Sequence, residues 1–315
     1  MSKGKVLITP RAFAKSGEKQ IQRMIDAGYD VQVNRTGKSY TYAEFVEYAK
    51  DVDGIIIGVD EADRGMLQSC PQLKAIAKYG VGVDNIDLAA AKTLNIEISR
   101  TIGSNSRSVA EHTIALMFAC AKNIVKTSID VKSGQWNKPY GIELEGKTLG
   151  IIGYGNIGQR VAAMAKGIGM TVFVYDVFPI DQQQALKDGV EIKSFDTLIQ
   201  ESDVITVHLP LTETTANLIH EKTLSMMKKG VIIINAARGG VVDEAALLEK
   251  LNDHHVFAAG FDVFSSEPPQ KDSALVTNVD FILTPHIASK TLEADLKTME
   301  MAVTNILDAL ERSVK

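Results

Sequence analysis

The chain has 315 residues, about twice the length of a typical domain, so two domains are expected. Hydrophobic residues make up 45% of it and charged residues 23%, which excludes intrinsic disorder as the main state. A formal net charge of −5 without a basic block argues against nucleic acid as a partner. We expect a reduced, cytoplasmic protein without a membrane span, because Cys70 and Cys120 are its only cysteines and neither a signal peptide nor a long apolar stretch occurs.

Short runs rich in Ile and Val alternate with longer amphipathic segments along the chain. In chain order, the runs are 5–9, 30–34, 54–58, 73–79, 148–153, 170–176, 203–208, 231–235, 258–263 and 281–284. They show little alternation of polar and apolar residues, which is typical of parallel strands buried on both faces. The amphipathic segments between them complete the strand–helix–strand pattern of an α/β protein.

Two long amphipathic segments mark the domain organisation. The first, 108–125, interrupts the alternation of strands and helices near the middle of the chain. The second, 291–311, closes the chain and is too isolated to form a fold of its own. We therefore expect one domain made of residues 1–99 and 286–315, and a second domain made of residues 100–285.

A glycine-rich loop follows the apolar run 148–152 and opens a helical segment. Its G-x-G-x-x-G spacing is that of a dinucleotide-binding turn. Gly153 permits the tight turn, Gly155 lets the backbone approach a pyrophosphate, and Gly158 lets the helix pack on the strand. The N–H groups at the start of the helix would bind the phosphates. The predicted cofactor-binding residues of this loop are Gly153, Tyr154, Gly155, Asn156, Ile157 and Gly158.

An acidic residue, Asp176, ends the next apolar run, 23 positions after Gly153. That spacing is close to the roughly 20 residues expected for the acid that binds the cofactor ribose. A carboxylate accepts hydrogen bonds from both ribose hydroxyls and repels a 2′-phosphate. Val177 and Phe178, which follow, carry no compensating charge. The sequence therefore predicts NAD rather than NADP.

Polar residues stand at the expected carboxyl ends of several strands, where open α/β sheets bind ligands. They are His208, Arg238, Asp262 and His286, with Glu267 shortly after Asp262. A histidine suits proton transfer near neutral pH, and the planar fork of an arginine suits a carboxylate. The residues alone leave both His208 and His286 open as the proton carrier. The remaining histidines stand where structural or solvated residues are usual: His112, His220, His254 and His255.

Seven motifs resemble the D-isomer-specific 2-hydroxyacid dehydrogenases, and most closely their phosphoglycerate-dehydrogenase-like branch. They are GVGVDNID at 80–87, SNSRSVAEHTIALM at 104–117, GYGNIG at 153–158, HLPLT at 208–212, NAARGGVVDEAAL at 235–247, FDVFSSEPP at 261–269 and TPHIAS at 284–289. The resemblance covers nearly the whole chain. It implies two Rossmann-like, doubly wound parallel-sheet domains: a flavodoxin-like substrate-binding domain from residues 1–99 and 286–315, and an NAD-binding Rossmann domain from 100–285.

The resemblance also implies an NAD-dependent oxidoreductase that transfers hydride between nicotinamide and a 2-hydroxy or 2-keto acid, without a metal. His286 would be the acid/base, paired with Glu267, because a nearby carboxylate favours the imidazolium. Arg238 would bind the substrate carboxylate and carbonyl. The remaining implied contacts are Asp262 to the nicotinamide carboxamide, Val81, Gly82 and Asn105 on the substrate side, and Pro210, Thr215 and Ala236 on the cofactor side.

The substrate stays open between a D-2-hydroxy acid in general, D-3-phosphoglycerate, and hydroxypyruvate or glyoxylate. Phosphoglycerate enzymes of the family tend to carry an arginine near the end of the third strand. Here residues 57–61 are acidic and would repel a phosphate unless Arg64 or Lys78 turns inward. Glu267 argues against formate, because the formate-oxidising branch carries glutamine at this position.

Two further expectations concern partners. The resemblance suggests a homodimer through the cofactor domain, with Trp136 near the contact. An NAD-sensing binding protein like the corepressors of the superfamily is the alternative to an enzyme. We disfavour it, because that role would require partner-binding extensions or a damaged catalytic triad, and the sequence has neither.

Overall fold

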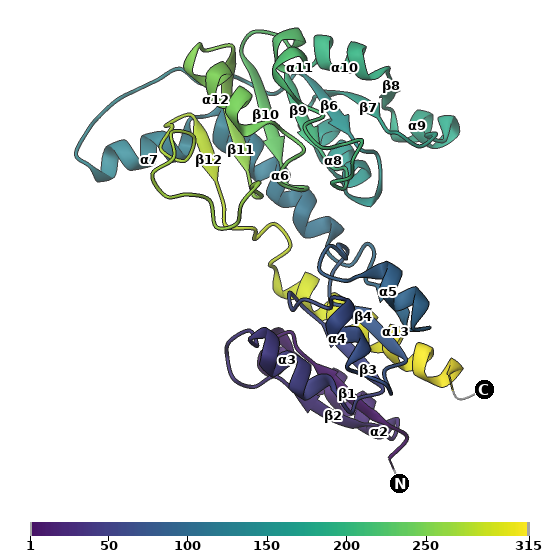
Figure 1. Ribbon diagram of the computed structural model, residues 1–315. Coiled ribbons are helices and arrows are strands. Elements are labelled where there is room, and N and C mark those ends of the chain that lie inside the picture. Colours follow the sequence, from purple (N-terminus) through teal and green to yellow (C-terminus); the bar gives the residue numbers. More distant parts are fainter. Residues whose placement is uncertain (1, 314–315) are drawn as a thin grey trace. The chain divides into compact units, whose positions relative to one another are not determined.

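The computed structural model describes residues 2–313, which form two compact units (Figure 1). One unit consists of Met1–Asn105 and Lys290–Lys315, and the other of Ser106–Ser289. The chain thus passes from one unit to the other after Asn105 and again after Ser289. The sequence predicted these crossings after residues 99 and 285.

The first unit is built on a five-stranded parallel sheet with the order β2-β1-β3-β4-β5. This is the flavodoxin-like order, in which the direction of winding reverses between β1 and β3. Its strands are β1 (Lys5–Ile8), β2 (Asp30–Val33), β3 (Gly54–Ile57), β4 (Ala75–Lys78) and β5 (Glu97–Arg100).

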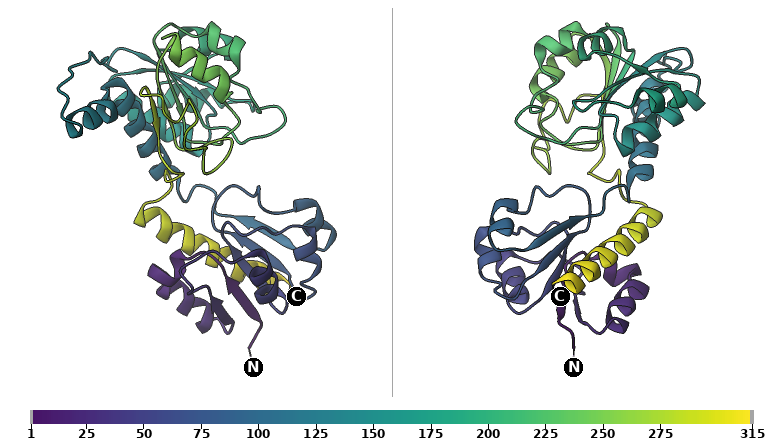
Figure 2. Two further views of the ribbon diagram at one scale, coloured as in Figure 1. Left: turned by 60° about the vertical axis from the view of Figure 1, so that its left-hand side comes forward. Right: turned by 90° about the vertical axis from the view of Figure 1, so that its right-hand side faces the viewer.

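Helices cover both faces of this sheet, because β1, β3 and β4 are buried on both sides. They are α1 (Ala12–Ser16), α2 (Glu18–Asp26), α3 (Tyr42–Ala49), α4 (Arg64–Gln68), α5 (Leu88–Thr93) and α13 (Leu292–Arg312). The last helix of the chain, α13, lies against β3, β4 and β5 (Figure 2). Its Val303 and Ile306 are fully buried in one cluster with Val6 and Ile8 of β1.

The second unit is built on a seven-stranded parallel sheet with the order β12-β11-β10-β9-β6-β7-β8. Its first six strands in chain order follow the Rossmann order, so the winding reverses between β6 and β9. The strands are β6 (Thr148–Ile152), β7 (Thr171–Tyr175), β8 (Glu191–Ile192), β9 (Val204–Val207), β10 (Val231–Asn235), β11 (Val256–Phe261) and β12 (Phe281–Leu283). Both sheets therefore have the predicted α/β fold class.

The helices of the second unit bury two separate cores against the two faces of its sheet. They are α6 (Ser106–Ala121), α7 (Ile124–Lys132), α8 (Asn156–Gly167), α9 (Gln182–Asp188), α10 (Phe195–Glu201), α11 (Glu221–Met226) and α12 (Glu244–Asn252). Buried residues of α6, α8 and α9 share one core, and those of α10, α11 and α12 share the other. No helix within residues 2–313 is long and apolar enough to cross a membrane.

The structure differs from the predicted elements in three places. The strands β5 and β8 were not predicted, because each lies at a sheet edge and lacks a buried apolar run. The predicted helix 108–125 is divided, because Asn123 adopts a left-handed conformation with φ of 54°. The helix α6 therefore ends at Ala121, and a separate helix, α7, begins at Ile124.

Candidate active site

The three glycines of the loop between β6 and α8 meet three different surroundings. Gly153 has φ of 102°, and a Cβ there would lie 2.7 Å from the carbonyl oxygen of His208. A Cβ on Gly158 would lie 2.1 Å from the carbonyl oxygen of Gly153. A Cβ on Gly155 would meet no heavy atom of the described chain within 4 Å. Gly153 and Gly158 thus allow close packing, whereas Gly155 leaves room in front of the first turn of α8.

The carboxylate of Asp176 fastens this loop from the end of the neighbouring strand β7. One oxygen accepts a hydrogen bond from Tyr154 N at 2.7 Å, and the other accepts from Phe178 N at 3.0 Å. The phenol of Tyr154 donates to Asp188 Oδ2 at 2.7 Å, and burial together with this bond raises the pKa of Tyr154. A carboxylate has about four acceptor positions, so Asp176 keeps capacity for the hydroxyls of a ribose. The open space in front of Gly155 and the half-buried carboxylate of Asp176 fit the pyrophosphate and the ribose of an NAD molecule.

His208 stands at the end of β9, beside the glycine loop. Its Nε2 lies 3.1 Å from Thr206 Oγ1, and its Nδ1 is buried without a hydrogen-bond partner in residues 2–313. Burial lowers the pKa of His208 to about 3. The imidazole is therefore neutral at pH 7 and has no additional proton to donate. A neutral imidazole at this position is poorly suited to donate a proton to a substrate.

Arg238 lies in the loop that follows β10. The buried side chain of Asn235 braces this loop: its Nδ2 donates to Arg238 O at 2.9 Å, and its Oδ1 accepts from Ala237 N at 3.1 Å. The guanidinium is half-buried and donates through Nη1 to Ala237 O at 2.7 Å. A Cβ on Gly239 would lie only 1.9 Å from Phe264 O, so this loop presses directly on the loop after β11.

Glu267 and His286 form a pair between the loops that follow β11 and β12. The Nδ1 atom of His286 lies 2.7 Å from Glu267 Oε2, and Glu267 Oε1 accepts from Phe264 N at 3.1 Å. The His286 side chain is 50% exposed and that of Glu267 37% exposed, so a ligand has access to the pair. Because Nδ1 faces the carboxylate, Nε2 is the nitrogen that would exchange a proton with a substrate.

Asp262 is the buried acid beneath this pair, with 1% of its surface exposed. Its carboxylate accepts from Thr284 Oγ1 at 2.6 Å, Ile287 N at 2.8 Å and Ala288 N at 2.8 Å. About four acceptor positions are available on a carboxylate, so one is left for the predicted contact with a carboxamide. In this structure, Asp262 holds the loop that carries His286.

The loops that carry Arg238, Glu267 and His286 all follow the carboxyl ends of their strands. Their strands β10, β11 and β12 are direct neighbours and run parallel, so their carboxyl ends point the same way. The glycine loop follows β6, two strands from β10 in the same sheet. The described residues contain no group of three or more His, Cys, Asp or Glu side chains that could hold a metal ion.

Three further residues predicted on the cofactor side lie in this unit. Thr215 Oγ1 donates to Pro210 O at 2.6 Å and accepts from Thr212 N at 2.7 Å, which closes the turn after β9. Ala236 is buried in a small apolar cluster with Val109, Ala288 and Ile157. The cluster joins the start of α8 to the loops that follow β10 and β12.

The residues predicted on the substrate side, apart from Arg238, belong to the first unit. Val81 and Gly82 lie half-buried in the loop after β4, next to Gly80, whose N–H donates to Thr101 Oγ1 at 3.0 Å. The Oδ1 atom of Asn105 is buried and has no hydrogen-bond partner within the described chain. Such an unsatisfied acceptor is unusual in a folded protein, and it could accept a hydrogen bond from a ligand.

Lys78 turns inward at the end of β4, and its Nζ donates to Gly58 O at 2.5 Å and Asn85 Oδ1 at 2.7 Å. Asp60 accepts a hydrogen bond from the Thr9 hydroxyl. Arg64 is mostly exposed and lies 3.9 Å from Asp87.

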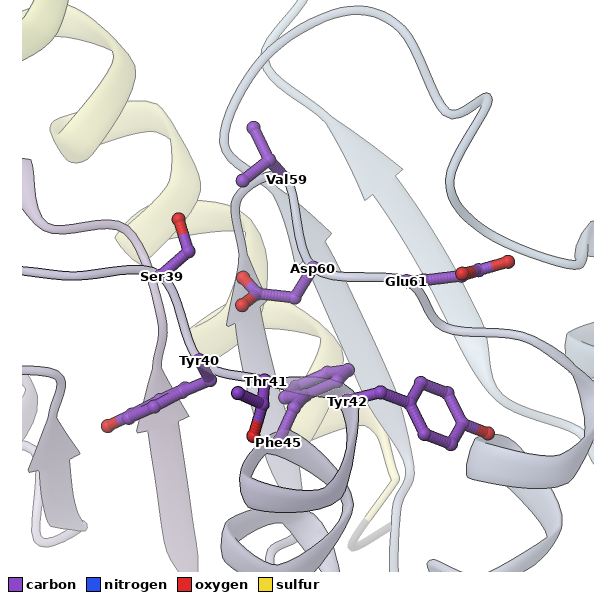
Figure 3. Close-up of a pocket in the computed structure, with 8 residues that line it drawn as sticks. All are labelled: Ser39, Tyr40, Thr41, Tyr42, Phe45, Val59, Asp60 and Glu61. Carbon is purple, nitrogen blue, oxygen red and sulfur yellow. The ribbon is translucent and has the colours of Figure 1, made fainter.

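Figure 3 shows a pocket beside Asp60, whose carboxylate points into it while Glu61 points away. None of its lining residues is basic: Ser39, Tyr40, Thr41, Tyr42, Phe45, Val59, Asp60 and Glu61. The pocket is therefore poorly suited to a phosphate.

Sequence reasoning missed three residues that hold the site together. Asn235 was treated only as the end of a strand, and Gly239 only as part of a motif. His112, interpreted as structural, places its Nε2 3.0 Å from Thr284 Oγ1 and 3.6 Å from Asp262 Oδ1. The Gly-Gly pair after Arg238 is a local signal of a close backbone approach, whereas nothing local connects His112 with Asp262.

Known proteins resemble the chain along most of its length. The family model "D-isomer specific 2-hydroxyacid dehydrogenase, NAD binding domain" matches residues 114–288. A D-3-phosphoglycerate dehydrogenase from Archaeoglobus fulgidus is 41% identical over 92% of this chain, which spans 55% of that longer protein. A glyoxylate reductase from Thermococcus litoralis is 36% identical over 97% of this chain and 93% of its own.

Solved structures agree with this grouping. The crystal structure of a glyoxylate reductase from Paecilomyes thermophila superimposes with a TM-score of 0.87 at 29% identity, covering 99% of this chain and 97% of that one. The family model and the relatives agree, and the chain belongs to the D-isomer specific 2-hydroxyacid dehydrogenase family.

Proposed function

We propose that this protein transfers a hydride between NAD and a small 2-hydroxy or 2-keto acid. The observation that carries the proposal is the His286–Glu267 pair, in which Nδ1 and Oε2 lie 2.7 Å apart. This pair follows the carboxyl ends of β11 and β12, in the same sheet as β10, whose loop carries Arg238, and in the same unit as the glycine loop. In this proposal, the unit Ser106–Ser289 binds the cofactor, and the unit containing Val81, Gly82 and Asn105 contributes to substrate binding.

The site residues divide the chemistry of keto-acid reduction as follows. Arg238 binds the substrate carboxylate and polarises the carbonyl through its planar guanidinium. His286 donates a proton from Nε2 to the carbonyl oxygen, while Glu267 stabilises the imidazolium through Nδ1. Bound NADH supplies the hydride to the carbonyl carbon. In the oxidative direction, His286 takes the hydroxyl proton. The glycine loop and the start of α8 would hold the pyrophosphate, with Asp176 at the ribose.

The cofactor is NAD rather than NADP in this proposal, because Asp176 stands at the end of β7 and Val177 and Phe178 carry no positive charge. Initial rates with NADH and NADPH at matched keto-acid concentrations test the preference. We expect the lower KM for NADH. A lower KM for NADPH would refute this assignment while leaving the proposed reaction intact.

The substrate is an unphosphorylated keto acid such as glyoxylate or hydroxypyruvate in this proposal. The strand-end pocket beside Asp60 has no basic lining, and the ammonium of Lys78 is engaged by Gly58 O and Asn85 Oδ1. The alternative is 3-phosphohydroxypyruvate, suggested by the identity to the Archaeoglobus fulgidus protein. NADH oxidation with glyoxylate, pyruvate, hydroxypyruvate and 3-phosphohydroxypyruvate decides between them. A preference for the phosphorylated compound would contradict our choice, and turnover of none would contradict the enzyme itself.

We further propose a cytoplasmic homodimer that forms through α7 and the segment 133–143. Helix α7 has no buried residue, and Ile129 is 61% exposed. In the following segment, Trp136 is 76% exposed and Tyr140 96% exposed. Exposed large apolar side chains in consecutive segments of the chain support a protein contact there. Light scattering of the protein as it elutes from a size-exclusion column should give twice the mass of the chain. Ile129→Asp with Trp136→Asp should give the single-chain mass, whereas a single-chain mass for the parent would refute the dimer.

A further inference from the structure

The conformation of His286 requires support from its surroundings. Its φ of 54° lies in the left-handed region, which a residue with a Cβ adopts only when neighbouring contacts hold it there. Asp262 supplies those contacts to three successive N–H groups. Its backbone oxygen accepts from His286 N at 2.9 Å, and its carboxylate accepts from Ile287 N and Ala288 N. The position of Asp262 therefore determines the backbone that presents the imidazole.

Thr284 connects Asp262 to helix α6. The Thr284 hydroxyl lies 2.6 Å from Asp262 Oδ1, and its other acceptor, Phe261 O, is 3.5 Å away. A hydroxyl has one hydrogen, and the shorter bond to the carboxylate takes it. The hydrogen between Thr284 Oγ1 and His112 Nε2, which lie 3.0 Å apart, must then come from His112. His112 is thus a donor to this chain of hydrogen bonds.

The helix behind His112 is a rigid support. On both sides of His112, α6 buries Val109, Thr113 and Leu116, and the helix packs on β10, β11 and β12. Those are the strands whose loops carry Arg238, Asp262 and His286. A donor on this helix has a defined position relative to all three loops.

We propose that His112 is a positioning residue for the acid–base reaction: its Nε2–H orients Thr284 and Asp262, and these hold the loop Thr284–Ser289 in the conformation that pairs His286 with Glu267. The inference rests on the proposed function only for its kinetic consequence. The geometric part concerns the His286–Glu267 pair itself and can be measured without turnover.

Three variants separate the donor of His112 from its shape. His112→Phe keeps a ring and removes the donor. His112→Gln places an amide N–H near the position of Nε2. His255→Phe is the matched control, because His255 is also half-buried and its Nε2 has no hydrogen-bond partner in residues 2–313. We expect His112→Phe to lower kcat by about tenfold or more with an unchanged KM for NADH, since small misplacements of a catalytic group reduce rate steeply. His112→Gln should stay within about threefold of the parent, and His255→Phe should match it.

The ring-nitrogen resonances of His286, assigned with His286→Gln, provide a readout that needs no substrate. In the parent and in His112→Gln they should report an Nδ1 bonded to a carboxylate. In His112→Phe they should shift toward the values of an unpaired imidazole. Parent-like resonances in His112→Phe would overturn the proposal, as would equal losses in His112→Phe and His112→Gln. If the parent reduces no keto acid but the resonances shift as expected, the proposed function fails and the positioning role stands.

A second pair of variants covers the case in which His112→Phe does not fold. Thr284→Val removes the connecting hydroxyl, and Thr284→Ser retains it. We expect a tenfold or greater loss of kcat for Thr284→Val and near-parent activity for Thr284→Ser. Where both single variants fold, His112→Phe combined with Thr284→Val should be no slower than Thr284→Val alone, because both act on one chain of hydrogen bonds. Multiplied losses would overturn the proposal.

Discussion

The two sheets of this protein wind in the same manner and differ at the point where their strand order reverses. In the unit Ser106–Ser289 that point lies between β6 and β9, and a Cβ on Gly155 would meet no described atom within 4 Å. In the other unit it lies between β1 and β3, where the Thr9 hydroxyl donates to Asp60 and accepts from Gly58 N at 3.0 Å. The first reversal point leaves open space in front of the first turn of α8, whereas at the second a threonine side chain accepts from the backbone N–H of Gly58.

This difference shows that strand order alone does not create a phosphate site. Parallel strand ends offer N–H groups at both reversal points, but an anion reaches them only where side chains are absent. Glycine leaves that space in the second unit. In the first, the Thr9 hydroxyl already accepts from Gly58 N, and the neighbouring carboxylate of Asp60 would repel an anion. The Asn85 amide donates to Gly58 O at 3.2 Å.

The largest expected effects lie outside both reversal points, at the ends of β10 and β12. Arg238→Ala and His286→Ala should each lower kcat/KM by about 10³-fold or more, because they remove the carboxylate ligand and the proton carrier. The dissociation constant of NADH, measured by fluorescence titration, should change by less than about threefold. Near-normal kcat in either variant would contradict the assigned roles.

Two glycine variants test the reversal point between β6 and β9, where Gly155 leaves open space. Gly158→Ala should lower the free energy of unfolding by about 3 kcal/mol, because its Cβ would lie 2.1 Å from Gly153 O. Gly155→Ala should unfold at a denaturant concentration close to the parent's and bind NADH at least about tenfold more weakly, since its methyl group would occupy the space of the pyrophosphate. Unchanged NADH affinity in Gly155→Ala would show that the open space is not the phosphate site.

The stability of the second unit should depend on pH through His208. Burial lowers its pKa from 6.5 to about 3, so below pH 6.5 the unfolded chain binds a proton that the folded protein does not. The free energy of unfolding should therefore fall as pH decreases from about 6.5 toward 3, by up to about 1.4 kcal/mol per pH unit from this residue. Urea titrations of the parent and His208→Gln between pH 7 and 5 measure the difference. Parallel curves for the two proteins would contradict a lowered pKa of His208 in the folded protein.

The smallest expected effect on NADH binding belongs to the reversal point between β1 and β3. Thr9→Val removes the acceptor for Gly58 N and the donor to Asp60, which should cost about 1 to 3 kcal/mol of unfolding free energy. The dissociation constant of NADH should stay at the parent value, with Ser16→Val on the exposed end of α1 as a control for the substitution. A change in NADH affinity for Thr9→Val alone would break the distinction between the two reversal points.

Much of the fold follows from local pattern. Helices cover both faces of a central parallel strand, so such a strand is a continuous apolar run in the sequence, as for β3, β6 and β10. The edge strands β5 and β8 have one neighbour each and need no such run, and they were missed. The break at Asn123 was also missed, because the residues on both sides of it continue a helical pattern.

The site residues also divide into features that a local pattern predicts and features that it does not. The spacing of Gly153, Gly155 and Gly158 indicated a dinucleotide loop, and the motifs indicated Arg238, Glu267 and His286 as functional residues. The geometry between these residues was beyond the sequence. Neither the packing of Gly239 against Phe264 O, which leaves no space for a Cβ, nor the burial that lowers the pKa of His208 has a local signature.

The sequence by itself determined the fold class, the glycine loop and the chemical types of the site residues, because each depends on spacing within a few turns or one strand. Only the tertiary structure decided which side chains act together. His112 and Thr284 lie 172 positions apart in the chain and meet because α6 packs beneath the strands that end at the site. Contacts of that kind arise from the packing of whole elements, which no short segment of sequence contains.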